Sequence, residues 1–70
     1  MIILDKIRER LIEAIKQSGL SQTEIAKRLG IKQPTVGQYL TGRAMPALDT
    51  FANLCEILDL DPAYILCLTN

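Results

Sequence analysis

The sequence predicts an all-α domain, and three observations carry this prediction. First, apolar residues recur at helical spacing in successive segments of the 70-residue chain. Second, glycine follows three of these segments, at Gly19, Gly30 and Gly42, where a left-handed residue ends a helix without strain. Third, Pro34 and Pro62 fall in expected first turns, where a missing N–H breaks no intrahelical hydrogen bond. Taken in order, the segments give five expected helices.

The first expected helix runs from Leu4 to Ser18, and Asp5 stands where a side chain starts or caps a helix. Its apolar face consists of Leu4, Ile7, Leu11, Ala14 and Ile15. The charged side chains are expected mostly in solvent, namely Lys6, Arg8, Glu9, Arg10, Glu13 and Lys16. Ile2 and Ile3 remain as an apolar arm, which either extends the helix, covers the edge of the core or contacts a partner chain.

Residues 21–42 predict two short helices joined by a tight turn. Ser21 and Glu24 have the spacing of a capping box, in which each side chain accepts a hydrogen bond from the other residue's backbone N–H. Ala26 is small enough for two helices to cross closely, and Gly30 suits a turn of a few residues. The pattern is therefore typical of a helix-turn-helix.

The second helix of this pair is expected to begin near Lys32 or Gln33 and to end at Gly42. Its apolar face consists of Val36, Tyr39 and Leu40, which favours a core position for Tyr39 over a phosphate contact through its hydroxyl. The opposite face is polar and carries no acid, and its residues are Lys32, Gln33, Thr35, Gly37, Gln38 and Thr41.

A loop at 43–47 leads to the fourth expected helix, whose N-cap position holds Ala47, a poor capping residue. Its buried stripe is expected to be Leu48, Phe51, Ala52, Leu54, Cys55 and Leu58. Asp61 then caps a fifth helix with Pro62 at its first position. The residues that follow are too apolar for a lone surface helix, so a homodimer seam is expected there, formed by Tyr64, Ile65, Leu66 and Leu68.

Two sequence stretches resemble a known family. Q-T-E-I-A-K-R-L-G-I-K-Q-P-T-V-G-Q-Y-L-T-G, followed by G-R-x-x-P-x-L-D-T-F-x-x-L, is similar to the Cro/repressor-type (Xre-like) helix-turn-helix DNA-binding proteins. The likeness covers residues 4 to 68. It implies a five-helix lambda-repressor-like fold, with residues 1–70 as one domain. It also implies a transcriptional regulator that binds double-stranded DNA as a homodimer on a near-palindromic operator, with repression as the favoured role.

The resemblance places the second helix of the pair in the DNA major groove. Candidate base contacts are then Gln33, Pro34, Thr35 and Gln38. A glutamine amide can pair with adenine through two hydrogen bonds, whereas Pro34 offers only apolar contact and Gly37 has no side chain. Gln33 and Gln38 are therefore the expected readers.

Candidate phosphate contacts come from both helices of the pair and from the residue after them. They are Gln22, Lys32, Thr41, Arg43, Lys27 and Arg28. The resemblance supplies most of the weight for Gln22, which stands at the start of the first motif helix. Lys27 and Arg28 are equally well explained as solvated charges.

The formal net charge is zero, but the charges are unevenly distributed. All eight basic residues lie in 1–43, where four acids leave a balance of +4. Residues 44–70 hold four acids and no base, a balance of −4. Because the positive half contains the helix pair, the asymmetry favours the approach of a polyanion to that face.

Composition argues against several other classes of protein. No apolar run approaches the roughly 20 residues of a membrane span, so we expect a cytoplasmic protein, and the short chain leaves no room for a ligand-sensing domain. The family resemblance implies a nucleoid-associated protein of a bacterium or phage. There is no histidine, and Cys55 and Cys67 are expected as reduced core residues, which argues against a metal site. No catalytic motif, cofactor site or small-molecule site is expected.

Other roles of the same fold stay open. One is the antitoxin of a toxin–antitoxin pair, and another is the controller of a restriction–modification system. A third is a protein-interaction module that has lost DNA binding, which the neutral net charge, Pro34, Gly37 and the apolar C-terminal helix favour.

Overall fold

The computed structural model describes residues 1–70 and contains five α-helices and no β-strand. The helices are α1 (Leu4–Gln17), α2 (Gln22–Leu29), α3 (Gln33–Thr41), α4 (Leu48–Leu58) and α5 (Pro62–Ile65). The all-α prediction with five helices is confirmed. No helix has the length and apolar character needed to cross a membrane.

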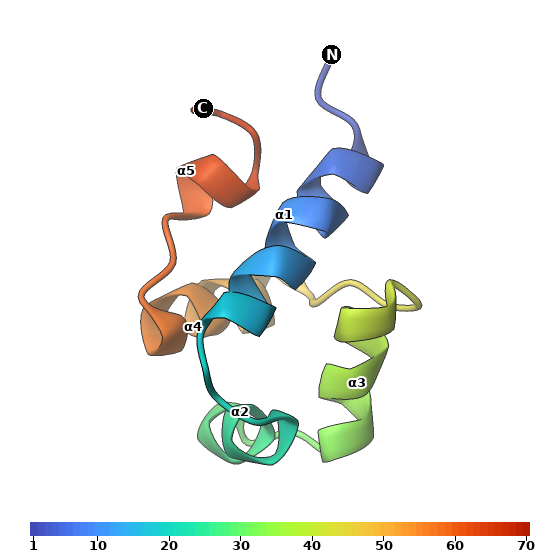
Figure 1. Cartoon of the computed structure of the whole chain (residues 1–70), viewed down its shortest axis with the longest axis vertical. Coiled ribbons are helices and arrows are strands. Elements are labelled where there is room, and N and C mark those ends of the chain that lie inside the picture. Colours follow the sequence, from blue (N-terminus) through green and yellow to red (C-terminus); the bar gives the residue numbers. More distant parts are fainter.

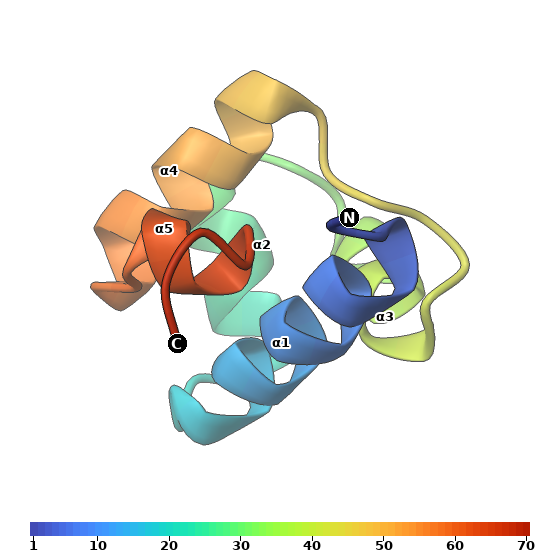
Figure 2. The same ribbon diagram turned by 90° about the horizontal axis from the view of Figure 1, so that it is seen from above.

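The helices surround a single core (Figure 1). α2 crosses below the end of α1, while α3 stands to one side of α1 and packs against both α1 and α2. α4 lies behind and also contacts α2, whereas α5 packs against α1. Both chain termini lie at the end of the molecule away from α2, and the view from above shows α1 between α3 and α5 (Figure 2).

The boundaries of α2 follow from its sequence. Ser21 Oγ accepts a hydrogen bond from the Glu24 backbone N–H at 3.1 Å, as the capping box predicts. The reciprocal bond is absent, and Glu24 Oε2 accepts a hydrogen bond from Arg28 Nε at 2.8 Å. Gly30 ends the helix with φ 71°, and the backbone N–H of Ile31 bonds to Ala26 O at 3.0 Å. The expected capping box is thus only half formed.

α1 begins as expected, but its first turn is more exposed than its pattern predicts. Leu11 and Ile15 are buried, whereas Leu4 is 54 % exposed. The prediction that Leu4 joins the buried face is wrong, because the first turn extends beyond the end of the core. Asp5 does not cap the helix either, since Ile3 is the N-cap residue and Asp5 accepts a hydrogen bond from Arg8.

α4 has a narrower buried face than its apolar residues indicate. Leu54 and Cys55 are buried, with Phe51 and Leu58 partly buried beside them. The prediction is wrong for Leu48, which is 86 % exposed in the first turn, and for Ala52, which lies to one side of the buried face. Ala47 makes no side-chain cap, as its residue type predicts.

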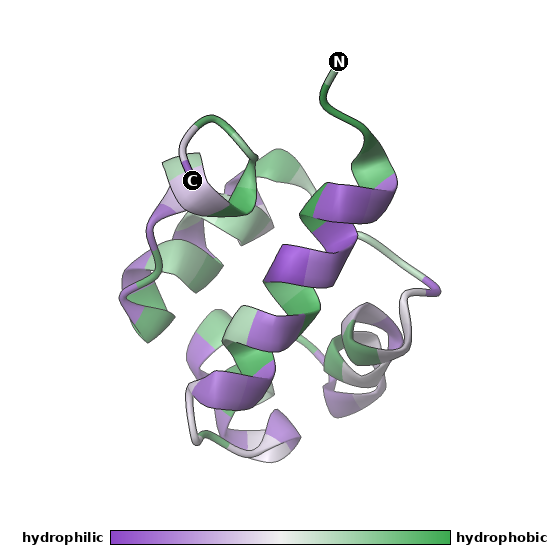
Figure 3. Cartoon of the chain, turned by 45° about the horizontal axis from the view of Figure 1, so that its top comes forward, coloured by the Kyte–Doolittle hydropathy of each residue, from purple (hydrophilic) through white to green (hydrophobic).

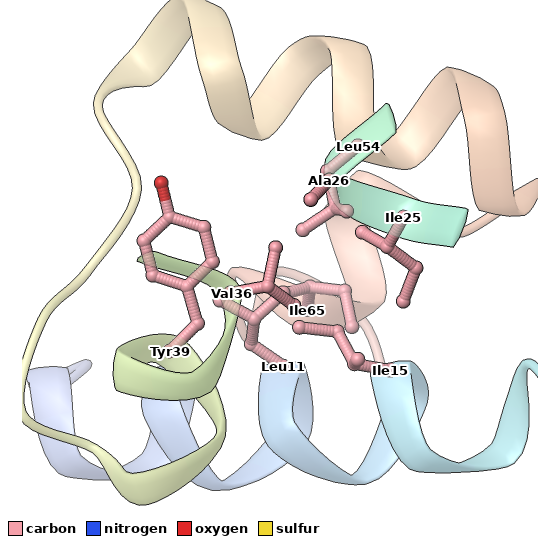
Figure 4. Packing of buried hydrophobic residues seen from close by; sticks show 8 residues of the cluster. All are labelled: Leu11, Ile15, Ile25, Ala26, Val36, Tyr39, Leu54 and Ile65. Atoms are coloured by element: carbon pink, nitrogen blue, oxygen red, sulfur yellow. The ribbon is translucent and has the colours of Figure 1, made fainter. Parts of the chain in front are cut away.

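The core takes side chains from every helix: Leu11, Ile15, Ile25, Ala26, Val36, Tyr39, Leu54 and Ile65 (Figure 4). Tyr39 is 6 % exposed, which confirms its predicted place in the core, and its hydroxyl points away from the other seven side chains. Burial raises the pKa of that hydroxyl above 10.0. Val36 and Tyr39 therefore fix α3 against the core.

The C-terminal segment differs from the expected dimer seam. Asp61 Oδ1 caps α5 by accepting from the Ala63 N–H at 3.0 Å, as predicted. Ile65, however, is 1 % exposed and belongs to the core, so its place among the dimer candidates is wrong. The reason is that α5 has a single turn, and Ile65 is its inward-facing residue. Tyr64 and Leu68 remain exposed, and Leu66 is partly buried.

Both cysteines are free. Cys55 is buried in α4, and burial, together with the Asp61 carboxylate, raises the pKa of its thiol above 9.0. Cys67 is only partly buried, so the expectation that both thiols are core residues holds for Cys55 alone.

Candidate nucleic-acid interface

α3 has one face in the core and one face in solvent. Val36 and Tyr39 are buried, while the opposite face exposes Lys32, Gln33, Pro34, Gln38 and Thr41. Two further residues of that face, Thr35 and Gly37, are half-buried. No acidic residue occurs in the first turn of α3 or elsewhere along it. The solvent-exposed face of α3 is therefore polar along the whole helix and carries no negative charge.

The two expected base-contacting residues, Gln33 and Gln38, make no side-chain hydrogen bonds within the protein. Within the helix-turn-helix motif, the side-chain hydrogen bonds join Ser21 to Glu24, Arg28 to Glu24 and Thr41 to a main-chain carbonyl. Gln33 and Gln38 take part with their side chains in none of these. Each exposed amide can thus offer both a donor and an acceptor to a ligand.

Gln22 lies close to α3, although it belongs to α2. A Cβ built on Gly37 would stand 3.3 Å from Gln22 Oε1. The structure therefore brings together the candidate phosphate contact at the start of α2 and the middle of the polar α3 face. Gly37 contributes space rather than a side chain to this arrangement.

The other end of the α3 face holds Thr41 and Arg43, which are both exposed. Gly42 between them ends α3 with φ 78°. Thr41 Oγ1 donates to Gln38 O at 3.2 Å, and the Arg43 backbone N–H donates to the same carbonyl at 3.0 Å. These bonds fix the backbone at the end of α3, where Arg43 is exposed.

The two basic residues of α2 differ in their partners. Arg28 is paired with Glu24, and this hydrogen bond lowers the pKa of Glu24 below 4.5. Lys27 is exposed and makes no ion pair. Part of the Arg28 charge is therefore already neutralised, whereas the charge of Lys27 is not.

Sequence reasoning missed one residue at this surface. Arg8 of α1 was expected in solvent, but its side chain is only 29 % exposed, and its Cδ lies 3.0 Å from where a Cβ would stand on Gly42. No local signal indicates this contact, because it joins residues far apart in the chain. It follows from the packing of α1 against α3.

Comparison with known proteins identifies the family of the chain. A family model described as helix-turn-helix matches residues 11–65, and the chain therefore belongs to the helix-turn-helix family. The Xre-like resemblance carried by the motif is confirmed. No solved structure gives a significant match.

Three curated relatives illustrate the range of similar proteins. The antitoxin HigA1 of Mycobacterium tuberculosis is 39 % identical over 71 % of this chain and 36 % of its own length. An HTH-type transcriptional regulator of conjugative element R391 from Providencia rettgeri is 40 % identical over 54 % of the chain and 18 % of its own. The uncharacterized HTH-type transcriptional regulator YqaE of Bacillus subtilis is 36 % identical over 83 % and 50 %. The chain thus spans half or less of each relative.

Proposed function

We propose that the protein binds double-stranded DNA sequence-specifically and regulates transcription, with α3 lying in the major groove. The observation that carries this proposal is the exposed, acid-free face of α3, whose Gln33 and Gln38 amides have no intramolecular partners. The regulators among the relatives support the same role.

In this proposal the glutamines contact the DNA bases, and the surrounding residues contact the phosphates of the DNA backbone. Gln33 and Gln38 pair with adenine, Pro34 makes apolar contact, and the half-buried Thr35 contributes less. Phosphate contacts come from Gln22, Lys27, Lys32, Thr41 and Arg43. Arg28 would first have to leave Glu24, so it ranks below them.

The distribution of charge supports the same orientation. The +4 balance of residues 1–43 includes α2, α3 and Arg43, and the −4 balance of residues 44–70 includes α4 and α5. A polyanion is attracted to the first group and repelled by the second. A neutral chain can in this way present a basic surface to DNA.

We further propose a homodimer that represses transcription from a near-palindromic operator. Two copies of α3 would then lie about 34 Å apart, one turn of B-DNA. The exposed Tyr64 and Leu68, with the partly buried Leu66, are the remaining candidates for the contact between copies.

The proposal is tested by selecting bound sequences from a random duplex pool and then measuring affinity for selected and for random duplexes over a range of salt concentrations, for the wild type and a Gln33→Ala/Gln38→Ala double variant. Wild-type affinity should fall steeply with salt, and the double variant should lose about 1–3 kcal/mol of base discrimination per good contact. Asn53→Ala, which removes an exposed amide from α4, is the control. Absence of salt-dependent binding by the wild type would contradict the proposal.

A second candidate is an interaction module that holds a protein partner, as an antitoxin does. The likeness to HigA1 favours it, as do the exposed apolar residues Met1, Ile2 and Ile3, which form the segment that projects from the start of α1 (Figure 3). This role requires no discrimination between DNA sequences. The Gln33→Ala/Gln38→Ala variant should then behave as the wild type does in partner binding.

A further inference from the structure

The side chain of Arg8 is held at the C-terminal end of α3. A Cβ on Gly42 would stand 3.0 Å from Arg8 Cδ and 3.7 Å from Arg8 Nε. Arg43 is the next residue in the chain after Gly42 and is exposed. Two arginines from distant parts of the sequence, one on α1 and one after α3, therefore border the same glycine.

The guanidinium of Arg8 uses little of its hydrogen-bonding capacity within the protein. Its NH1 donates to Asp5 Oδ1 at 2.7 Å, and its Nε is buried without an acceptor. A guanidinium has five N–H donors. The side chain of Asp5 is 84 % exposed, so the one ion pair that Arg8 makes is a surface pair. Such a pair is weak, and another anion can displace the Asp5 carboxylate from Arg8.

A purely structural role would explain part of this geometry. A cation near the C-terminus of a helix interacts favourably with the helix dipole, and Arg8 lies at that end of α3. Such a role accounts for the position of the charge. It accounts neither for the spare donors nor for the second arginine beside it.

We propose that Arg8 is a phosphate-binding residue, which together with Arg43 grips the DNA backbone at the end of α3. This inference rests on the proposed DNA-binding function and adds α1 to the interface. Phosphate takes the place of the Asp5 carboxylate as the acceptor for the Arg8 guanidinium. The contact fixes the position of α3 on the duplex and carries no sequence information.

The chain offers a matched control on the same helix. Lys6 pairs with Glu9 at 3.8 Å, as Arg8 pairs with Asp5, and both pairs have i,i+3 spacing. Two residues apart on a helix, Lys6 and Arg8 point in nearly opposite directions. Lys6 borders the hollow lined by the N-terminal arm and Cys67, away from Gly42. Lys6→Gln thus removes the same charge from the other side of α1.

The test measures duplex affinity against salt for the wild type, Arg8→Gln, Arg8→Lys and Lys6→Gln. Arg8→Gln should lower the slope of log K against log salt by about 0.9, the effect of one lost phosphate contact. Arg8→Lys should restore most of that slope, Lys6→Gln should keep it, and the selected base sequence should be unchanged. Equal slopes for the wild type and Arg8→Gln would overturn the inference while leaving the proposed function standing.

A second pair of variants covers the case in which Arg8→Gln fails to fold, as judged by circular dichroism. Asp5→Asn removes the carboxylate that competes with phosphate for Arg8, so the affinity of this variant for DNA should rise. Glu9→Gln removes the partner of Lys6, and its affinity for DNA should rise less. Equal effects of the two would overturn the inference. If the wild type binds no duplex at any salt concentration, the proposed function fails, and this inference falls with it.

Discussion

Gln22 Oε1 lies 3.3 Å from the position that a Cβ would take on Gly37, so the first residue of α2 rests over the middle of α3. The contact joins a candidate phosphate contact to the helix that carries the candidate base contacts. Gly37 leaves room for the Gln22 side chain there, at the conformational cost that a glycine carries in a helix interior.

Gly37→Ala should stabilise the fold. Alanine in a helix interior is favoured over glycine by about 0.5–1 kcal/mol, and the flexible Gln22 amide needs to move by only a few tenths of an ångström. Urea denaturation followed by circular dichroism measures the change. A destabilised variant would indicate that Gln22 is held more firmly than its exposed position implies.

Gly30→Ala is the matched control for this substitution. A Cβ there would meet nothing within 4 Å, but φ is 71°. The left-handed conformation alone should cost about 1–2 kcal/mol. Alanine is thus expected to raise stability at Gly37, which lies in a helix interior, and to lower it at Gly30, which ends a helix.

Ala47→Ser should stabilise α4. Ala47 already has the extended backbone of an N-cap residue, with φ −60° and ψ 161°, but its side chain caps nothing. A serine there should add about 1 kcal/mol and raise Tm by about 4–8 °C. Ser21→Ala, which removes the cap of α2, should lower Tm by a similar amount, and calorimetry measures both. An unchanged Tm for Ala47→Ser would mean that a serine there leaves α4 uncapped.

Leu54→Ala and Leu48→Ala should differ sharply although both truncate a leucine of α4. Leu54 is 0 % exposed and Leu48 is 86 % exposed. The first variant should lose about 2–5 kcal/mol through lost burial and a cavity, while the second should be close to neutral. Chemical denaturation measures the free energy of unfolding of both variants. Equal losses would mean that α4 is wrongly placed against the core.

Arg28→Gln should raise the pKa of Glu24. The hydrogen bond from Arg28 is the largest cause that lowers this pKa below 4.5 in the folded protein. A titration of the Glu24 carboxyl carbon by NMR, in both proteins, measures the shift. Identical titrations would show that the ion pair does not persist in solution.

The same pair sets a dependence of stability on pH. Because the pKa of Glu24 is lower in the folded than in the unfolded chain, its contribution is present above 4.5 and is lost as pH falls through the folded pKa. The wild type should therefore lose more stability than Arg28→Gln between about pH 6 and about pH 3. Denaturant midpoints at the two pH values measure this difference, and equal losses would contradict it.

Local signals predicted the helices well because each boundary depends on neighbouring residues. Ser21, Gly30, Gly42 and Asp61 end or begin helices through bonds and backbone angles of their own segments. The predictions that proved wrong concern where a helix meets the core. Leu4 and Leu48 fit the apolar pattern, yet both lie in first turns that reach past the packed side chains.

The candidate interface shows the same division. The solvent-exposed face of α3 could be predicted from spacing, since Val36 and Tyr39 fix which side faces inward. The approach of Gln22 to Gly37 and of Arg8 to Gly42 could not, because each depends on how separate helices cross. Periodicity within one helix carries no information about that crossing.

Selection of bound sequences from a random duplex pool would show whether α3 reads a specific DNA sequence. We expect enrichment of a two-fold symmetric site with half-sites about one helical turn apart, and adenines at positions that Gln33 and Gln38 can reach. A single short half-site would retain DNA reading but remove the homodimer. No enrichment, even at low salt where attraction to the backbone is strongest, would contradict the claim.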